Sequence, residues 1–200
     1  QARALAALGQ VDELNEVLDE IEAASDLTWV HRALRNTVDA LGAYGHADAA
    51  QQVAERVAGW FERRPPEEAA TLTHRVLYGR ALFSAGRTGE AQDVLDAVVA
   101  EFPENFWGRG VRAFIAASRG DTAQAMSDIA WFSADERLAI SQWQRGTIAG
   151  ALGDRQLAVS LIREAIEKPT YQFGADQLLH MEYHPLRDYP PFQELLRPKG

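Results

Sequence analysis

A glycine recurs along this chain at a nearly constant interval, each time between two apolar stretches. The glycines are Gly9, Gly45, Gly86, Gly120 and Gly153, and the steps between them are 36, 41, 34 and 33 residues. Intervals of this size are typical of stacked helical hairpins, in which each repeat is one pair of helices. Glycine suits the left-handed residue that ends the first helix of a pair. The interval therefore predicts an all-α chain built from helix pairs.

Small residues recur at two fixed positions relative to these glycines. The residues five positions after these glycines are Leu14, Ala50, Ala91, Ala125 and Ala158. The residues seven positions before them are Ala2, Val38, Gly79, Ala113 and Gly146. A bulky side chain at a close helix crossing would hold the two backbones apart. The small residues therefore predict where the two helices of a pair cross, and Val38 marks the second pair as less regular.

At these positions the chain resembles the tetratricopeptide repeat family. Gly79 or Gly146 matches the small residue of that repeat's first helix, and Pro103 matches its terminal proline. The alanine that opens its second helix is matched by Ala91, Ala125 and Ala158. The resemblance covers about residues 67–168 and is weaker over 1–66, where a variant helical repeat remains an alternative. It implies a right-handed superhelix of antiparallel helix pairs, a solenoid with about five repeats and a C-terminal cap.

We expect a single helical-repeat domain over residues 1–200. Its parts are a partial first repeat at 1–26, a divergent repeat at 27–66, three tetratricopeptide-like repeats at 67–103, 104–135 and 136–169, and a capping tail at 170–200. RRPPEEAA in the 41-residue step predicts a lengthened second helix and then a loop at Pro65–Pro66. Pro103 and Pro169 should each stop a second helix. Because Gly9 leaves little room for a first helix before it, we expect the chain to be a fragment of a longer protein.

The tail HPLRDYPPFQELLRPKG has lost the period. Its apolar residues Leu186, Phe192, Leu195 and Leu196 are expected to cover the last helix pair, because a solenoid needs a cap to stay soluble. The tail resembles the one that closes repeat arrays in bacterial multidomain signalling proteins, where such arrays follow kinase, nucleotide-cyclase, TolB-like or winged-helix regions.

That resemblance implies a non-catalytic protein-interaction or sensory module of a larger bacterial regulatory protein, binding a peptide or partner domain in its concave groove. One alternative is a structural scaffold or self-association module. Another is an accessory region of an enzyme whose catalytic domain lies upstream.

The composition argues against several functions. Acidic residues outnumber basic ones by 29 to 20, giving a net charge of −9. A chain this acidic lacks the cationic face that neutralises phosphates, so we expect no nucleic-acid partner. The absence of cysteine removes disulfides, thiolate metal sites and thiol nucleophiles. No apolar run approaches the roughly 18 residues that span a bilayer, so no direct membrane insertion is expected. The expected location is cytoplasmic, or periplasmic or otherwise extracytoplasmic if the parent chain has an upstream membrane span.

No motif in the chain indicates catalysis. In HMEYH, His180 and His184 are four residues apart and would share a helix face that could chelate a metal. However, Glu182 does not stand where a zinc protease has its glutamate, and Pro185 follows at once, so a solvated helix end is the favoured interpretation. Nucleophile elbows, phosphate loops and dinucleotide fingerprints are absent from the sequence. We therefore expect no catalytic residue, no metal, no cofactor and no enzyme activity.

A partner-binding surface remains as the functional hypothesis. In the tetratricopeptide repeat family the first helices line the concave wall. Carrying those inward positions over selects Arg32, Arg35, Asn36, Arg80, Phe83, Trp107, Phe114 and Trp143, with Asp39, Ser84, Gln144 and Thr147 beside them.

Arginine and aromatic side chains dominate binding hot spots, so the implied partner is a protein or a peptide, with self-association left open. For Phe114 and Trp143 an equal alternative is that they fill space between helix pairs. The family's carboxylate clamp wants an asparagine where Asp39 brings a negative charge, so binding of chaperone tails is not expected.

Overall fold

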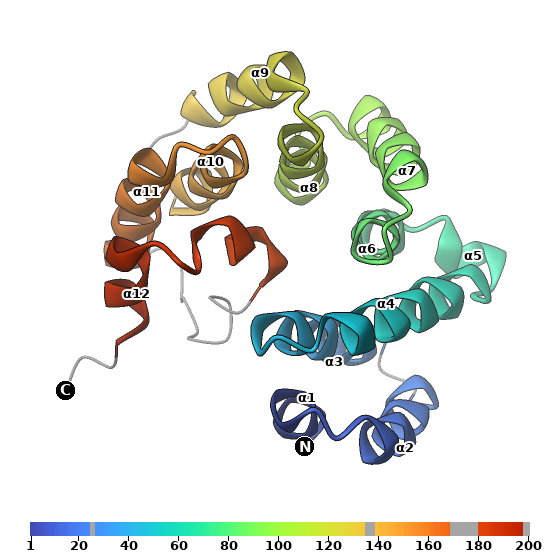
Figure 1. Ribbon diagram of the computed structural model, residues 1–200. Coiled ribbons are helices and arrows are strands. Elements are labelled where there is room, and N and C mark those ends of the chain that lie inside the picture. The colour runs from blue at the N-terminus through green and yellow to red at the C-terminus, as the bar shows by residue number, and fades with distance from the viewer. Residues whose placement is uncertain (25–26, 135–138, 169–179, 198–200) are drawn as a thin grey trace. The chain divides into compact units, whose positions relative to one another are not determined.

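The computed structural model describes residues 1–24, 27–134, 139–168 and 180–197, and within them all regular secondary structure is helical. The helices, labelled in Figure 1 where there is room, are α1 (Ala2–Leu8), α2 (Val11–Glu22), α3 (Leu27–Ala43), α4 (Ala47–Glu62), α5 (Pro66–Ala69), α6 (Leu72–Ser84), α7 (Thr88–Glu101), α8 (Phe106–Ser118), α9 (Thr122–Ser133), α10 (Ala139–Ala151), α11 (Arg155–Glu167), the 3-10 helix η2 (Met181–Leu186) and α12 (Pro190–Leu196). The predicted all-α class is confirmed for this part of the chain.

All five recurring glycines end a first helix in the left-handed conformation. Their φ angles are 68° at Gly9, 86° at Gly45, 76° at Gly86, 80° at Gly120 and 92° at Gly153. A side chain disfavours such angles, which explains why glycine recurs here. The residue after each glycine donates its N–H to a carbonyl five residues back, as from Arg87 to Leu82 at 2.9 Å. The predicted turn positions are therefore confirmed.

The chain divides into two compact units. Unit 1 comprises residues 1–104 together with His180 and Met181, and unit 2 comprises the residues from Asn105 onward apart from that short segment. The division between Glu104 and Asn105 falls next to the predicted repeat boundary at 103/104. The single domain over residues 1–200 stays a prediction.

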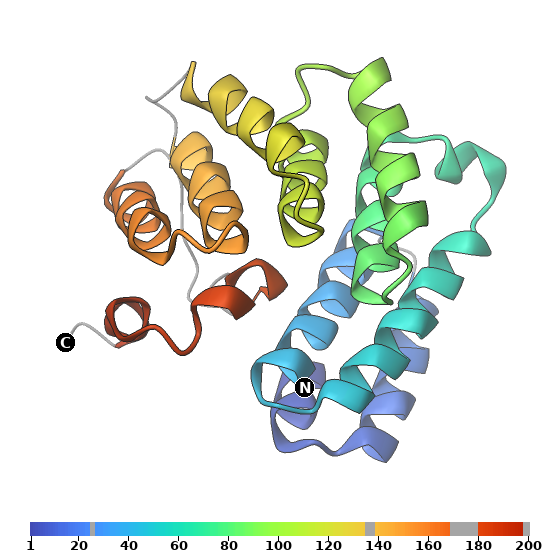
Figure 2. The same ribbon diagram turned by 45° about the horizontal axis from the view of Figure 1, so that its top comes forward.

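Unit 1 contains the helix pairs α1/α2, α3/α4 and α6/α7, with α1 also contacting α3 and α4 contacting α6. Figures 1 and 2 show the second helix of these pairs lying beside the first. At 16 residues α4 is longer than α2 or α7, as predicted. The expected loop is confirmed for Pro65, whereas Pro66 begins the short helix α5, because a proline at the first helical position has no N–H to satisfy. Helix α7 ends at Glu101, just before Pro103, whereas Pro169 lies outside the described residues.

The predicted close crossings occur in the two helix pairs whose first helix has glycine at the crossing position. A Cβ on Gly79 would lie 2.7 Å from Leu95 Cγ, and one on Gly146 would lie 2.9 Å from Ile162 Cγ1. Contacts this short do not occur between real side chains, so only glycine lets α6 approach α7, and α10 approach α11, this closely. Three of the alanines five residues after a turn glycine are fully buried: Ala91, Ala125 and Ala158.

Unit 2 contains the pairs α8/α9 and α10/α11, with α10 also contacting α8 and α9. The tail packs on its last pair: Leu186 and Phe192 are fully buried among Trp143, Ile162 and Ala165. Leu195 is partly buried against the same cluster. The expectation for Leu196 is wrong, because this side chain is 43% exposed. Helix α12 contacts the cluster through Phe192 and Leu195 instead.

Candidate interaction surface

The eight candidate partner-binding residues differ in accessibility. Arg32 and Trp107 are exposed, Arg35, Asn36 and Phe83 are partly buried, and Arg80, Phe114 and Trp143 are buried. Five of them belong to unit 1 and three to unit 2. The two groups take part in different kinds of contact.

In unit 2 the candidate aromatics belong largely to the packing between helices. Phe114 and Trp143 are each 4% exposed, and the indole N–H of Trp143 donates to the hydroxyl of Tyr183. Their burial favours the alternative in which they fill space between helix pairs. Trp107 is 45% exposed and meets Trp143 edge to face at 5.7 Å between ring centroids.

The polar neighbours of these aromatics are buried as well. Gln144 is 3% exposed and Thr147 fully buried. A Cβ on Gly110 would collide with Gln144 Oε1, so the amide side chain fills the space that this glycine leaves between α8 and α10. Apart from the exposed Trp107, the candidate first-helix positions of unit 2 thus serve internal contacts.

Unit 2 also buries a carboxylate that the sequence reasoning missed. Asp128 on α9 is fully buried and accepts from Arg109 at 2.8 Å, from Arg112 at 2.7 Å and from Gln124 at 2.9 Å. The Arg109 guanidinium also lies 4.5 Å from the centre of the Trp131 ring. A buried carboxylate needs cationic and hydrogen-bonding partners, and these side chains all come from the α8/α9 pair.

In unit 1 the candidate arginines gather around Asp39, which is 2% exposed on α3. Arg80 Nη2 on α6 lies 3.2 Å from Asp39 Oδ2, and Arg35 Nε lies 4.0 Å from the same oxygen. Burial lowers the pKa of Arg80 to about 10 and Arg35 adds to this, whereas Asp39 acts in the opposite direction. Arg80 therefore remains charged at neutral pH, and the pair is a buried ion pair between two first helices.

The contact between Asp39 and Arg80 has a signal in the sequence. Each residue stands six positions before its turn glycine, Gly45 and Gly86 respectively. Helices α3 and α6 contact each other, and the ion pair joins residues at equivalent positions of these two first helices. Asp39 is therefore the counterion of Arg80, which belongs to the next repeat.

A short segment from far along the chain completes this cluster. The main-chain N–H of Met181 donates to Asp39 Oδ1 at 3.1 Å, and the hydroxyl of Ser84 donates to Met181 Sδ at 3.2 Å. His180, beside it, is 5% exposed. Burial lowers the pKa of His180 well below its ordinary value, and the positive charges of Arg80, Arg35 and Arg3 lower it further. The imidazole is therefore neutral at pH 7.

These contacts correct the interpretation of HMEYH. His184 is exposed, as a solvated helix end requires, but His180 is buried because it lies against the charged cluster of α3 and α6. His180 also precedes η2, which begins at Met181, so the two histidines do not share a helix face. No sequence signal marks this packing, because His180 lies more than ninety residues after the end of either helix.

Two further candidates, Arg32 and Asn36, lie in an open groove formed by α1, α2 and α3. The groove has a volume of about 720 Å³ and its polar and aromatic lining includes Arg3, Glu20, Trp29, Arg32 and Asn36. Trp29 is 46% exposed and was not selected from the sequence. Its signal is the spacing of three residues to Arg32, which puts both on one face of α3. The groove has the size of a ligand-binding cleft.

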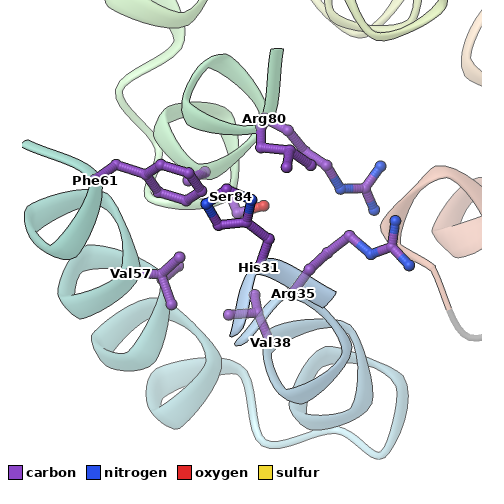
Figure 3. A pocket seen from close by; sticks show the side chains of 10 residues that line it. His31, Arg35, Val38, Val57, Phe61, Arg80 and Ser84 are labelled. Carbon is purple, nitrogen blue, oxygen red and sulfur yellow. The ribbon is translucent and has the colours of Figure 1, made fainter. Parts of the chain in front are cut away.

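A much smaller cavity lies between α3, α4 and α6 (Figure 3). Its volume of about 20 Å³ holds a single water molecule at most. His31 lines it with Val57 and Phe61, and its ring stacks on Phe61 at 4.9 Å between centroids. Burial, with smaller effects of His74 and Arg64, lowers the pKa of His31 to about 4, against an opposing effect of Glu68. In Figure 3 the side chains of Arg35 and Arg80 extend past this cavity toward the same side.

Nothing else in the described residues has the chemistry of a metal or membrane site. Groups of three or more histidine, aspartate or glutamate side chains placed to hold a metal ion are absent from this part of the chain. The helices described here are also too short or too polar to cross a membrane. Comparison with protein-family models, with curated proteins and with solved structures gives no match to this chain.

Proposed function

We propose that this chain is a non-catalytic protein-interaction module whose first helices in unit 1 bind a peptide or a segment of a partner protein. The observation that carries the proposal is the hydrogen bond from the Met181 main-chain N–H to Asp39, between residues 142 positions apart in sequence. Any peptide main chain can make this contact, and recognition of extended peptides depends on main-chain hydrogen bonds of this kind.

The groove with Arg32 and Asn36 extends the proposed surface along α3. Its lining includes an exposed tryptophan, Trp29, together with Arg3 and Arg32, and tryptophan and arginine are among the residue types that contribute most to binding. In this proposal the helix pairs form a tetratricopeptide-like right-handed superhelix whose first helices line the concave wall. The left-handed glycine turns and the close crossings at Gly79 and Gly146 support that arrangement.

The module belongs, in this proposal, to a larger bacterial regulatory protein and works in the cytoplasm, on the strength of the resemblance of its tail to those of signalling proteins. The second candidate function is a structural scaffold, favoured by the burial of Phe114 and Trp143 in unit 2. The two functions assign different work to the two units, so variants in each unit distinguish them.

The test is a selection of peptides from a displayed random library on the full chain. A selected peptide should bind at least about tenfold more weakly to Arg32→Glu, which corresponds to a loss of about 1.4 kcal/mol. The matched control is Arg155→Glu, an equal charge change at a surface ion pair with Asp188 in unit 2, and it should leave affinity unchanged. A library that yields no binding peptide, or peptides equally sensitive to both variants, would overturn the proposal.

A further inference from the structure

His180 is poorly matched to the side chains around it. It is 5% exposed, and its Nε2 atom has no hydrogen-bond partner among the described residues. The charges that act on it are those of Arg80, Arg35 and Arg3, all positive. A neutral imidazole cannot make the charge-assisted hydrogen bonds that a carboxylate makes with guanidinium groups.

Met181, in contrast, is well matched. Its main-chain N–H meets a buried carboxylate oxygen of Asp39 at 3.1 Å, and its sulfur accepts from the Ser84 hydroxyl at 3.2 Å. The site therefore satisfies the main chain of the segment and the side chain that follows, but not the side chain at position 180. This is the pattern expected of a site occupied by an imperfect substitute for another segment.

The face of unit 1 that comprises the Asp39 cluster and the groove of α1, α2 and α3 differs in charge from the whole protein. Its first-helix and groove residues include four cationic side chains and two anionic ones: Arg3, Arg32, Arg35, Arg80, Glu20 and Asp39. The chain as a whole carries a net charge of −9. A local excess of positive charge on an acidic protein favours an anionic partner and steers its approach.

We propose that this face of unit 1 binds an extended segment of a partner protein that carries a carboxylate side chain at the position of His180, and that His180 and Met181 occupy the site in its absence. The proposal rests on the interaction function argued above and adds the chemistry of the partner and an intramolecular competitor. Because Asp39 accepts the main-chain N–H of the residue that follows position 180, the recognised segment continues beyond its carboxylate-bearing residue. The segment is therefore internal to the partner chain.

The first experiment uses the chain's own segment as the probe. His180→Glu brings a carboxylate to the three arginines, so it should raise the melting temperature by about 2–4 °C in low salt, and the rise should shrink in high salt. His180→Gln is the neutral control and should give no rise, and His180→Lys should lower the melting temperature. A His180→Glu protein that is no more stable than His180→Gln would contradict the proposed preference for a carboxylate.

The second experiment measures competition. Met181→Pro removes the N–H that Asp39 accepts, at the first position of η2, where proline is tolerated. The probe is a fluorescent seven-residue peptide that copies residues 178–184 with the His180→Glu change. By fluorescence anisotropy, the full-length Met181→Pro protein should bind it at least about tenfold more tightly than the wild-type protein does, which is the ratio that an occupied fraction of 90% in the wild type gives.

The location is tested in the Met181→Pro background. Adding Arg35→Gln should weaken peptide binding, whereas Arg75→Gln, on α6 but paired with Glu101, should not. If the same peptide with His180→Lys binds equally well, the carboxylate preference is wrong and the interaction function survives. If neither peptide binds although the library selection succeeds, residues 180–181 are a permanent part of the fold. If the selection fails too, the interaction function itself is wrong.

Discussion

Two buried carboxylates, one in each unit, are satisfied in different ways. Asp128 in unit 2 accepts hydrogen bonds from Arg109, Arg112 and Gln124, which all belong to its own helix pair. Asp39 in unit 1 depends on Arg80 from the next pair and on the main chain of Met181. These contacts of Asp128 lie within one helix pair, whereas Asp39 also uses a contact from a segment outside the repeats, which in our proposal another segment replaces. This difference is why the proposed binding surface belongs to unit 1.

The same contrast holds for how the tail meets each unit. In unit 2 it contributes fully buried apolar side chains, Tyr183, Leu186 and Phe192, and Tyr183 stacks on Phe192 at 5.4 Å between ring centroids. In unit 1 it contributes polar contacts to a charged cluster. Apolar burial of this extent stabilises a fold by several kcal/mol, whereas an exchanged polar contact contributes about 1 kcal/mol. The tail should therefore be essential to unit 2 and replaceable in unit 1.

The largest expected effect is that of Phe192→Ala. Removing a fully buried phenylalanine should lower the free energy of unfolding by about 3–5 kcal/mol, because it leaves a cavity in the cluster with Trp143. Hydrogen exchange should show the loss of protection in α10 and α11 and little change in α3 and α6. Leu196→Ala, at a 43% exposed leucine of the same helix, is the control and should change stability by less than about 0.5 kcal/mol. An equal loss of protection in both units would show that they do not differ in their dependence on the tail.

The next effect is a pH dependence that should be confined to unit 1. The pKa of His31 is about 4, against an ordinary value of 6.5, and burial also lowers the pKa values of His74 and His180. Below pH 6.5 the unfolded chain binds protons that the folded unit does not. The stability that these neutral histidines contribute is therefore fully present above pH 6.5 and is lost as the pH decreases to 4. For His31 this loss lowers the free energy of unfolding by about 3 kcal/mol.

Urea unfolding between pH 7 and pH 4 measures this loss, and His31→Phe should remove the share that His31 contributes. The phenyl ring keeps the stacking on Phe61 and has no proton to bind. In unit 2 the described histidine is His184, which is exposed, so α10 and α11 should keep their protection over this pH range. A His31→Phe protein with the same pH dependence as the wild type would contradict the assignment.

The sequence predicted those parts of the structure that depend on local conformation and on repetition. The turn glycines could be predicted because the left-handed backbone conformation favours glycine at each turn. Gly79 and Gly146 could be predicted because a close helix crossing leaves no room for a side chain. The Asp39–Arg80 pair could have been found from the shared position of both residues before a turn glycine. The same position told nothing about Phe114, because an aromatic side chain suits a binding groove and a helix interface equally well. His180 and Met181 lie outside the repeats, so the periodicity of the sequence could not predict their contact with α3 and α6.

The smallest expected effect should be equal in the two units. Gly45 in unit 1 and Gly120 in unit 2 have φ angles of 86° and 80°, and a Cβ on either would meet no atom within 4 Å. Gly45→Ala and Gly120→Ala should therefore each lower the free energy of unfolding by about 1–2 kcal/mol through backbone strain alone. Gly89→Ala in α7 also has open space around its Cβ but a helical φ, and it should raise stability by about 0.4–1 kcal/mol. Chemical denaturation of the three variants measures these values. A loss at Gly120 without one at Gly45 would mean that the longer helices of the second repeat relieve the strain, and the glycine turn would then be a requirement of the regular repeats only.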